Sequence, residues 1–116
     1  MLRYWIYLIP IAVLGYLLWR RRPAPAADLK GMLDRGAQIV DVRTKAEFQS
    51  NADPRSINIP LGELEARIGE LDKNRPVLVC CATGSRSGLG LSFLKRAGFT
   101  EVANLGSWRR IASLLS

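Results

Sequence analysis

The sequence VLVCCATGSRS, residues 77–87, joins an apolar run to a short loop of small and polar residues. Val77 to Cys80 has the composition of a central strand that is buried on both faces. We expect a helix from Ser87 to Ala97, with Gly98 as its stop. The thiol of Cys81 therefore stands where a buried strand gives way to the start of a helix.

This position makes Cys81 a candidate nucleophile. A loop of small residues at a helix start can turn several backbone N–H groups toward one point, where the positive end of the helix dipole also lies. A cysteine thiolate, a persulfide or a bound oxyanion would each be stabilised at that point. The pKa of the thiol, about 8.5 in a free chain, is therefore expected to fall.

Strands and helices alternate along the rest of the chain. Short apolar runs predict strands, and apolar residues at helical spacing predict helices. The expected strands are residues 38–42, 57–60, 77–80 and 99–105, and the expected helices are residues 28–35, 61–71, 87–97 and 107–115. A further helical turn begins at a capping box formed by Thr44 and Glu47, whereas Asp28 is expected to cap the first of these helices. This alternation predicts an α/β fold with a small central parallel sheet covered by helices on both faces, and ligands in such sheets bind at the carboxyl ends of the strands.

The first residues have a different character. Residues 4–19 carry no charge, contain tyrosine and tryptophan at both ends, and are bounded by Arg3 and Arg20. This pattern predicts a transmembrane anchor over residues 1–22, a Pro/Ala tether over residues 23–27 and a domain over residues 28–116. The alternative is a cleaved signal peptide, because Ala24-Pro25-Ala26 resembles a cleavage site.

The basic flanks predict the orientation of this anchor. Arg20 to Arg22 outnumber Arg3, so the positive-inside rule places the domain on the cytoplasmic side of the inner membrane, with a periplasmic domain as the alternative.

Composition excludes several classes of chemistry. The 116 residues contain no histidine, which rules out Ser-His-Asp and Cys-His catalysis and His-ligated zinc. The only two cysteines are adjacent, so they form no disulfide framework, and Cys80 is expected to pack into the core on the opposite face from Cys81. A minor alternative is that Cys80 resolves an oxidised Cys81. The net charge of +7 comes with no nucleic-acid-binding motif, so no nucleic-acid partner is expected.

The loop after the strand matches a known pattern, Cys-x-x-Gly-x-Arg-Ser, at Cys81, Gly84, Arg86 and Ser87. Further motifs follow in the same order and at the same spacing at residues 39–43, 47–48, 56–61, 97–99 and 102–106. Together they resemble the single-domain rhodanese (sulfurtransferase) family, above all its short members of the phage-shock type. The chain departs from the family at residues 51–55, where a Gly-His-Ile-Pro-Gly segment is common.

The resemblance implies a rhodanese-like fold and a thiosulfate sulfurtransferase-like activity without a metal or organic cofactor. Cys81 would be the catalytic residue that carries sulfur as a persulfide, taking it from thiosulfate or a persulfide and passing it to a thiol or to cyanide. The substrate-binding residues would be Ala82, Thr83, Gly84, Ser85, Arg86 and Ser87, which we call the cradle loop.

Within the cradle loop, the Arg86 guanidinium is expected to hold a sulfonate oxygen. Ser87 is expected to be both the helix N-cap and a hydroxyl donor to the thiolate. Asp41 and Arg43 match a family motif near the floor of the site and are expected to be supporting residues, with Arg43 paired to Glu47.

Two other functions stay open from the sequence. A non-catalytic or redox-sensing rhodanese module tethered to a membrane has the same fold. Cys80 and Arg86 also satisfy Cys-x5-Arg, the signature of phosphatases and arsenate reductases on this fold, although glycine then falls at the fourth position after the cysteine instead of the third.

Overall fold

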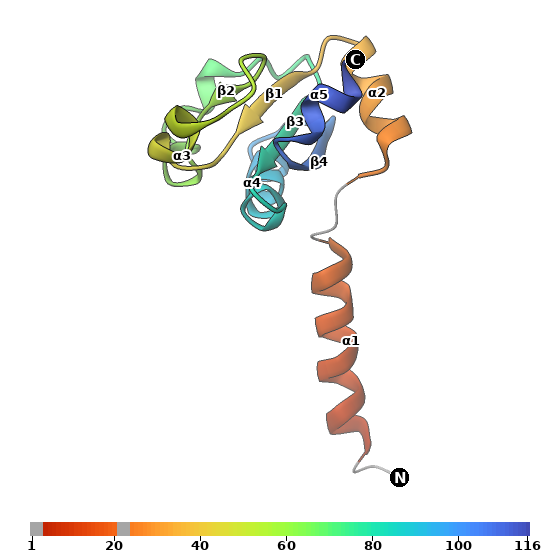
Figure 1. Cartoon of the computed structure of the whole chain (residues 1–116). Helices are drawn as coiled ribbons and strands as arrows, with labels where there is room; N and C mark the ends of the chain where they lie inside the picture. The colour runs from red at the N-terminus through yellow and green to blue at the C-terminus, as the bar shows by residue number, and fades with distance from the viewer. Residues whose placement is uncertain (1–3, 21–23) are drawn as a thin grey trace.

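The computed structural model describes residues 4–20 and 24–116, and its centre is one parallel sheet (Figure 1). The strands are β1 (Gln38–Asp41), β2 (Ile57–Asn58), β3 (Val77–Cys81) and β4 (Val102–Ser107), in the order β2-β1-β3-β4. All three pairings are parallel. The α/β fold with a parallel sheet that the sequence predicted is therefore confirmed.

Two apolar clusters cover the two faces of the sheet. On one face, α4 (Ser85–Arg96) packs through Leu94 against Val79 and neighbouring strand residues. On the other face, α2 (Ala26–Asp34) and α5 (Arg110–Leu114) pack against Leu78 and its neighbours. Helices therefore lie on both faces, as expected of strands whose side chains are buried in both directions.

Gly90 lets α4 approach the sheet closely. A Cβ atom added there would lie 3.2 Å from Cγ1 of Val79, closer than ordinary van der Waals contact. The small residue therefore lets α4, whose first turn contains Ser85 to Ser87 of the cradle loop, pack closely against β3.

Several predicted elements need correction. The segment 61–71 is not one amphipathic helix, but contains two short 3₁₀ helices, η2 (Leu61–Glu63) and η3 (Ile68–Glu70). Glycine lies inside each of them and disfavours an α-helix by about 1 kcal/mol relative to alanine. The first helix of the domain starts earlier than predicted, with Pro25 and not Asp28 at its N-cap. The capping box of Thr44 and Glu47 is confirmed at the start of α3 (Lys45–Ser50).

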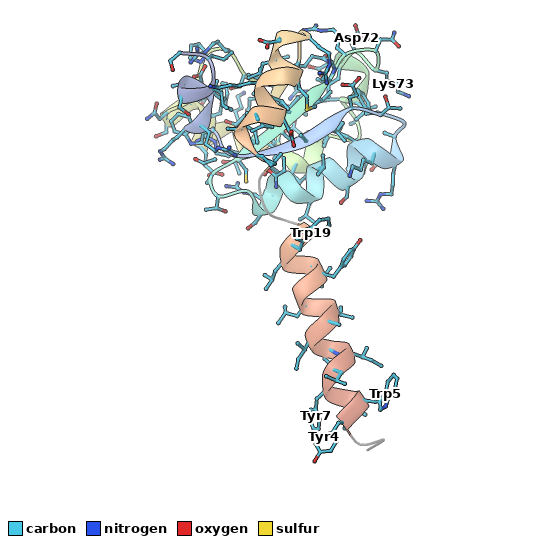
Figure 2. All side chains as sticks on the ribbon, turned by 90° about the vertical axis from the view of Figure 1, so that its right-hand side faces the viewer. Tyr4, Trp5, Tyr7, Trp19, Asp72 and Lys73 are labelled. Atoms are coloured by element: carbon cyan, nitrogen blue, oxygen red, sulfur yellow. The ribbon has the colours of Figure 1, made fainter. Side chains whose placement is uncertain are left out.

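The N-terminal helix α1 (Trp5–Arg20) points away from the sheet and its helices (Figure 1). Figure 2 shows Tyr4, Trp5 and Tyr7 at its beginning and Trp19 near its end. These four side chains are 58–63% exposed.

The transmembrane anchor predicted over residues 1–22 is not supported. Within residues 4–20 and 24–116, no helix combines the length and the hydropathy that crossing a membrane requires. The physical reason is length, because the 16 residues of α1 rise about 24 Å whereas the hydrocarbon core of a bilayer is about 30 Å thick. Three of the arginines that were to set the orientation, Arg3, Arg21 and Arg22, lie outside the described residues.

Candidate active site

Cys81 is the last residue of β3, at the carboxyl end of the sheet. Its side chain belongs to the cluster under α4, whereas the side chain of Cys80 belongs to the cluster under α2 and α5. Successive residues of a strand point to opposite faces, so only one of the two thiols faces the cradle loop. That thiol is Cys81, as the sequence predicted.

Three hydrogen bonds converge on the sulfur of Cys81. The backbone N–H of Gly84 donates to Sγ at 3.0 Å, and that of Ser87 donates at 3.4 Å. The thiol itself donates to Oγ of Ser87 at 3.4 Å. Two backbone N–H groups of the cradle loop therefore already donate to the sulfur, an arrangement that favours an anion.

Gly84 makes this loop possible. Its φ of +107° lies in the left-handed region that residues with a side chain rarely adopt, and it forms the N-cap of α4. The helix thus begins at Ser85, two residues earlier than predicted, and Ser87 is not the N-cap. Ser87 instead lies in the first turn, where the early N–H groups of a helix lack partners inside the helix and can point at a ligand.

The pKa values of the two cysteines are shifted in opposite directions. Burial alone would raise the pKa of Cys81, but its hydrogen bond with the Ser87 hydroxyl and those from the backbone N–H groups of Ser87, Gly84 and Thr83 outweigh it, so the pKa is lowered. For Cys80, burial and the charge of Asp41 together raise the pKa well above its ordinary value. At neutral pH, Cys80 is therefore a neutral core residue, and Cys81 is the thiol that ionises more readily.

Asn104 supports the cradle loop from the neighbouring strand, a role that we did not assign from the sequence. This buried residue of β4 donates to the carbonyl of Gly84 at 3.1 Å and accepts from Oγ of Ser87 at 2.6 Å. The N–H of Gly106 donates to the same side-chain oxygen at 2.9 Å, which fixes the orientation of the amide. Asn104 therefore holds both residues that contact the Cys81 sulfur.

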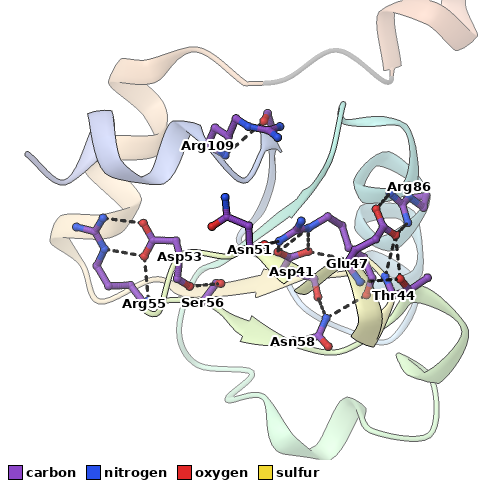
Figure 3. A network of polar contacts seen from close by, with 12 residues as sticks. Asp41, Thr44, Glu47, Asn51, Asp53, Arg55, Ser56, Asn58, Arg86 and Arg109 are labelled. Carbon is purple, nitrogen blue, oxygen red and sulfur yellow. Dashed lines mark hydrogen bonds and ion pairs between the residues drawn. The ribbon is translucent and has the colours of Figure 1, made fainter. Parts of the chain in front are cut away.

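Arg86 extends from the first turn of α4 to a carboxylate on α3 (Figure 3). Its two terminal nitrogens bind the two oxygens of Glu47 at 2.6 and 2.9 Å. The hydrogen bond from Arg86, with that from the backbone of Thr44, lowers the pKa of Glu47 to about 2. The predicted pairing of Arg43 with Glu47 is therefore wrong, because the partner of Glu47 is Arg86.

Arg43 instead pairs with Asp41, two residues earlier. The Arg43 guanidinium binds both carboxylate oxygens of Asp41 at 2.8 to 3.1 Å, and both side chains are almost completely buried. Arg43 also donates to the carbonyl of Asn51 and lies 4.6 Å from the ring centre of Trp108. The backbone N–H of Trp108 donates to the carbonyl of Cys81, which links this pair to the end of β3. Asp41 and Arg43 thus form a buried ion pair that is connected to the end of β3 through Trp108.

The remaining cradle residues line the loop at its surface. Thr83 and Ser85 are exposed, with their hydroxyl oxygens 3.5 Å apart, and Ala82 is half-buried. Among the described residues, no three side chains of His, Cys, Asp or Glu are grouped so as to hold a metal ion.

Comparisons with known proteins show the family of the chain. The model of the family described as the rhodanese-like domain matches residues 25–113. The thiosulfate sulfurtransferase PspE of Escherichia coli is 39% identical over 75 residues, which cover 63% of this chain and 72% of the relative. The chain also spans less than two thirds of other relatives, for example 39% of YrkF from Bacillus subtilis.

Solved structures of rhodaneses also resemble this chain. A rhodanese from E. coli, whose structure was solved with anions, is 37% identical and superposes with a TM-score of 0.61. The match covers 66% of this chain and 93% of that one. A rhodanese-related protein of Thermoplasma volcanium is 32% identical with a TM-score of 0.62, and the match covers 81% of this chain and 90% of that one. The chain belongs to the rhodanese-like family.

Proposed function

We propose that this member of the rhodanese-like family is a sulfurtransferase in which Cys81 carries sulfane sulfur as a persulfide. The donor is thiosulfate or a low-molecular-weight persulfide, and the acceptor is a thiol, or cyanide in an assay. The observation that carries the proposal is the convergence of the Gly84 and Ser87 N–H groups on the Cys81 sulfur.

The first half-reaction loads the enzyme. The Cys81 thiolate attacks the outer sulfur of thiosulfate, a new S–S bond forms, and the S–S bond of thiosulfate breaks. Sulfite leaves with the electron pair of the broken bond. No base is required at the moment of attack, because hydrogen bonds in the cradle loop already favour the thiolate.

The second half-reaction unloads it. The acceptor thiolate or cyanide attacks the outer sulfur of the persulfide, the S–S bond to Cys81 breaks, and Cys81 leaves as a thiolate. The N–H groups that favour the anion before loading then stabilise the leaving group, so one loop of Ala82 to Ser87 supports both halves. The thiosulfate sulfurtransferase activity of PspE and the anions in the related E. coli rhodanese support this donor class.

The alternative functions receive less support. A phosphatase loop that begins at Cys80 would need that thiol to face the loop and ionise, but Cys80 points into the opposite cluster and its pKa is raised. The same burial argues against a redox sensor in which Cys80 resolves an oxidised Cys81.

The mass of the intact protein tests the proposal. After incubation with thiosulfate and removal of the excess, we expect a gain of one sulfur atom, located on Cys81 by peptide mapping and lost on treatment with cyanide. A protein that gains no sulfur, or gains it on Cys80, would contradict the proposal.

A further inference from the structure

We propose that Glu47 is a positioning residue that sets the donor specificity of Cys81, because it pairs with Arg86 and so disfavours dianionic donors relative to less charged ones. This inference rests on the proposed sulfur transfer and goes beyond it by assigning the charge preference of the site. The charge of Glu47 acts through Arg86, and Glu47 itself need not touch the donor.

The geometry of the pair is well defined. Glu47 and Arg86 are 39 residues apart and join α3 to the first turn of α4 at the rim of the cradle loop (Figure 3). The contact is bidentate, and each side chain is about one third exposed, 35% for Arg86 and 37% for Glu47. A bidentate pair uses the fork of the guanidinium, the part that otherwise recognises planar or tetrahedral oxyanions.

The Glu47 side chain is itself held in place. Its Oε1 accepts from the backbone N–H of Thr44 at 3.2 Å and from the Thr44 hydroxyl at 3.1 Å. Glu47 is therefore fixed by the capping box on one side and by Arg86 on the other. A carboxylate held at two points stays close to the guanidinium when a donor anion approaches.

The pairing of Glu47 with Arg86 lowers the net positive charge near the site where a donor binds. Arg86 is close enough to Cys81 for the charge of the thiolate to contribute to raising the Arg86 pKa. Arg43, at the neighbouring strand end, is neutralised by Asp41. Arg86 and Arg43 thus each have a carboxylate partner, and the direct contacts to the Cys81 sulfur come from uncharged groups of the cradle loop.

The expected consequence is that the unmodified site prefers dianionic donors less than a site with an unpaired Arg86 would. Thiosulfate carries two negative charges, whereas methanethiosulfonate presents the same outer sulfur with one charge and releases methanesulfinate. An unpaired Arg86 would attract thiosulfate more strongly than methanethiosulfonate, because electrostatic attraction grows with the charge of the donor. Pairing with Glu47 removes most of the difference in attraction between the two donors.

The decisive experiment compares kcat/KM for these two donors in the Glu47→Gln variant. Glutamine keeps an oxygen for the Thr44 N–H, so the capping box is retained while the charge is lost. We expect the ratio of thiosulfate to methanethiosulfonate to rise about three- to tenfold at low ionic strength, mainly through KM, and the gain to shrink in high salt.

Glu70→Gln is the matched control. Glu70 also forms an ion pair with an arginine, Arg67, at 2.7 Å, but in η3. The substitution changes the net charge by the same amount, so an equal rise in the ratio for Glu70→Gln would show a general charge effect and overturn the inference. An unchanged ratio in Glu47→Gln, or an equal loss with both donors, would also overturn it.

Variants of Arg86 keep the test valid if Glu47→Gln folds poorly. Arg86→Gln leaves Glu47 unpaired, so the ratio should fall below that of the unmodified protein. A ratio that does not fall in Arg86→Gln would contradict the inference. Where Glu47→Gln folds, the double variant Glu47→Gln/Arg86→Gln should return close to the original ratio, and failure to do so would also contradict the inference. A protein that takes no sulfur from either donor contradicts the proposed function instead, which separates the two failures.

Discussion

Cys80 and Cys81 are adjacent in one strand and equally buried, yet they lie in regions of opposite character. Cys80 packs in the apolar cluster under α2 and α5, whereas Cys81 packs under α4 at the mouth of the cradle loop. Both are 0% exposed. The difference between them is the set of hydrogen-bond donors at the end of the strand.

This comparison shows that burial alone does not decide the pKa of a thiol. Desolvation is the largest contribution to the pKa of both cysteines and raises both. Only Cys81 has donors from a loop and a helix start that outweigh it. A strand that ends at a helix start thus places a thiol that ionises more readily one residue away from a thiol that stays neutral.

The most severe test of this contrast is removal of each sulfur in turn. Cys81→Ser should reduce thiosulfate:cyanide sulfur transfer to background, because the sulfur that carries the persulfide is gone. Cys80→Ala should keep most of the activity, because that thiol faces the opposite cluster. Steady-state kinetics of the two folded variants, checked by circular dichroism, would measure this. Exchanged phenotypes would show that the loop is assigned to the wrong cysteine.

The next largest effect is expected at Gly84. Gly84→Ala places a Cβ on a backbone with φ of +107°, at a cost of about 1–2 kcal/mol, or a shift of the loop. A shifted loop would move the N–H of residue 84 away from the Cys81 sulfur. We therefore expect at least about a tenfold loss of kcat/KM, since one hydrogen bond to a charged group contributes about 1.5–3 kcal/mol.

Gly31→Ala is the matched control for that loss. Gly31 lies inside α2 and has one atom within ordinary contact distance of an added Cβ, the end of the Arg35 side chain at 3.7 Å. Activity of Gly31→Ala should remain near that of the unmodified protein. If Gly84→Ala were equally active, the bond from the Gly84 N–H would not matter for catalysis.

The contrast also shows which features the sequence could predict. The apolar run of residues 77–80 and the small residues after it were enough to place Cys81 at the end of a central strand, because both signals are local. The contacts that hold the cradle loop in place join residues that are far apart in the sequence. Asn104 reaches the loop from the next strand, and Arg86 meets Glu47 across 39 residues, so only the tertiary structure reveals them.

The sequence-based predictions were wrong where two local patterns pointed to different structures. The spacing of apolar residues in the segment 61–71 predicted a helix, but the two glycines in that segment weaken an α-helix, and the chain forms short 3₁₀ helices instead. For Arg43, the i, i+4 spacing of a helical turn favoured Glu47, whereas the partner in the folded chain is the buried carboxylate of Asp41, two residues earlier.

A smaller effect is expected from Ser87→Ala, which removes a hydroxyl and keeps the backbone N–H. Losing this hydrogen bond should raise the pKa of Cys81, because the contact with the Ser87 hydroxyl is one of the causes that lower it. The rate of Cys81 alkylation by iodoacetamide rises with pH as the thiolate forms, so its midpoint should move to higher pH. An unchanged midpoint would assign the lowered pKa to the backbone groups alone.

The same variant has a stability signature. A thiol with a lowered pKa in the folded state contributes stability that is fully present above its unfolded pKa of about 8.5 and is lost as pH falls through the folded pKa. The unmodified protein should therefore gain stability with rising pH in that window, and Ser87→Ala should gain less. Urea unfolding at a series of pH values measures the difference.

The smallest effect is expected on the free energy of unfolding, which should differ between variants of Cys80 and Cys81. Cys80→Ala should lower the free energy of unfolding by about 1 kcal/mol, the cost of losing one buried atom of this size and leaving a small cavity. Cys80→Ser should cost about 1–3 kcal/mol, because it places a hydroxyl in an apolar cluster. Cys81→Ser should cost less than Cys80→Ser, because the N–H of Gly84 and the hydroxyl of Ser87 already lie around that side chain as partners. Urea unfolding of the three variants tests this order, and a larger loss for Cys81→Ser than for Cys80→Ser would mean that the polar groups of the cradle loop do not accommodate an oxygen at Cys81.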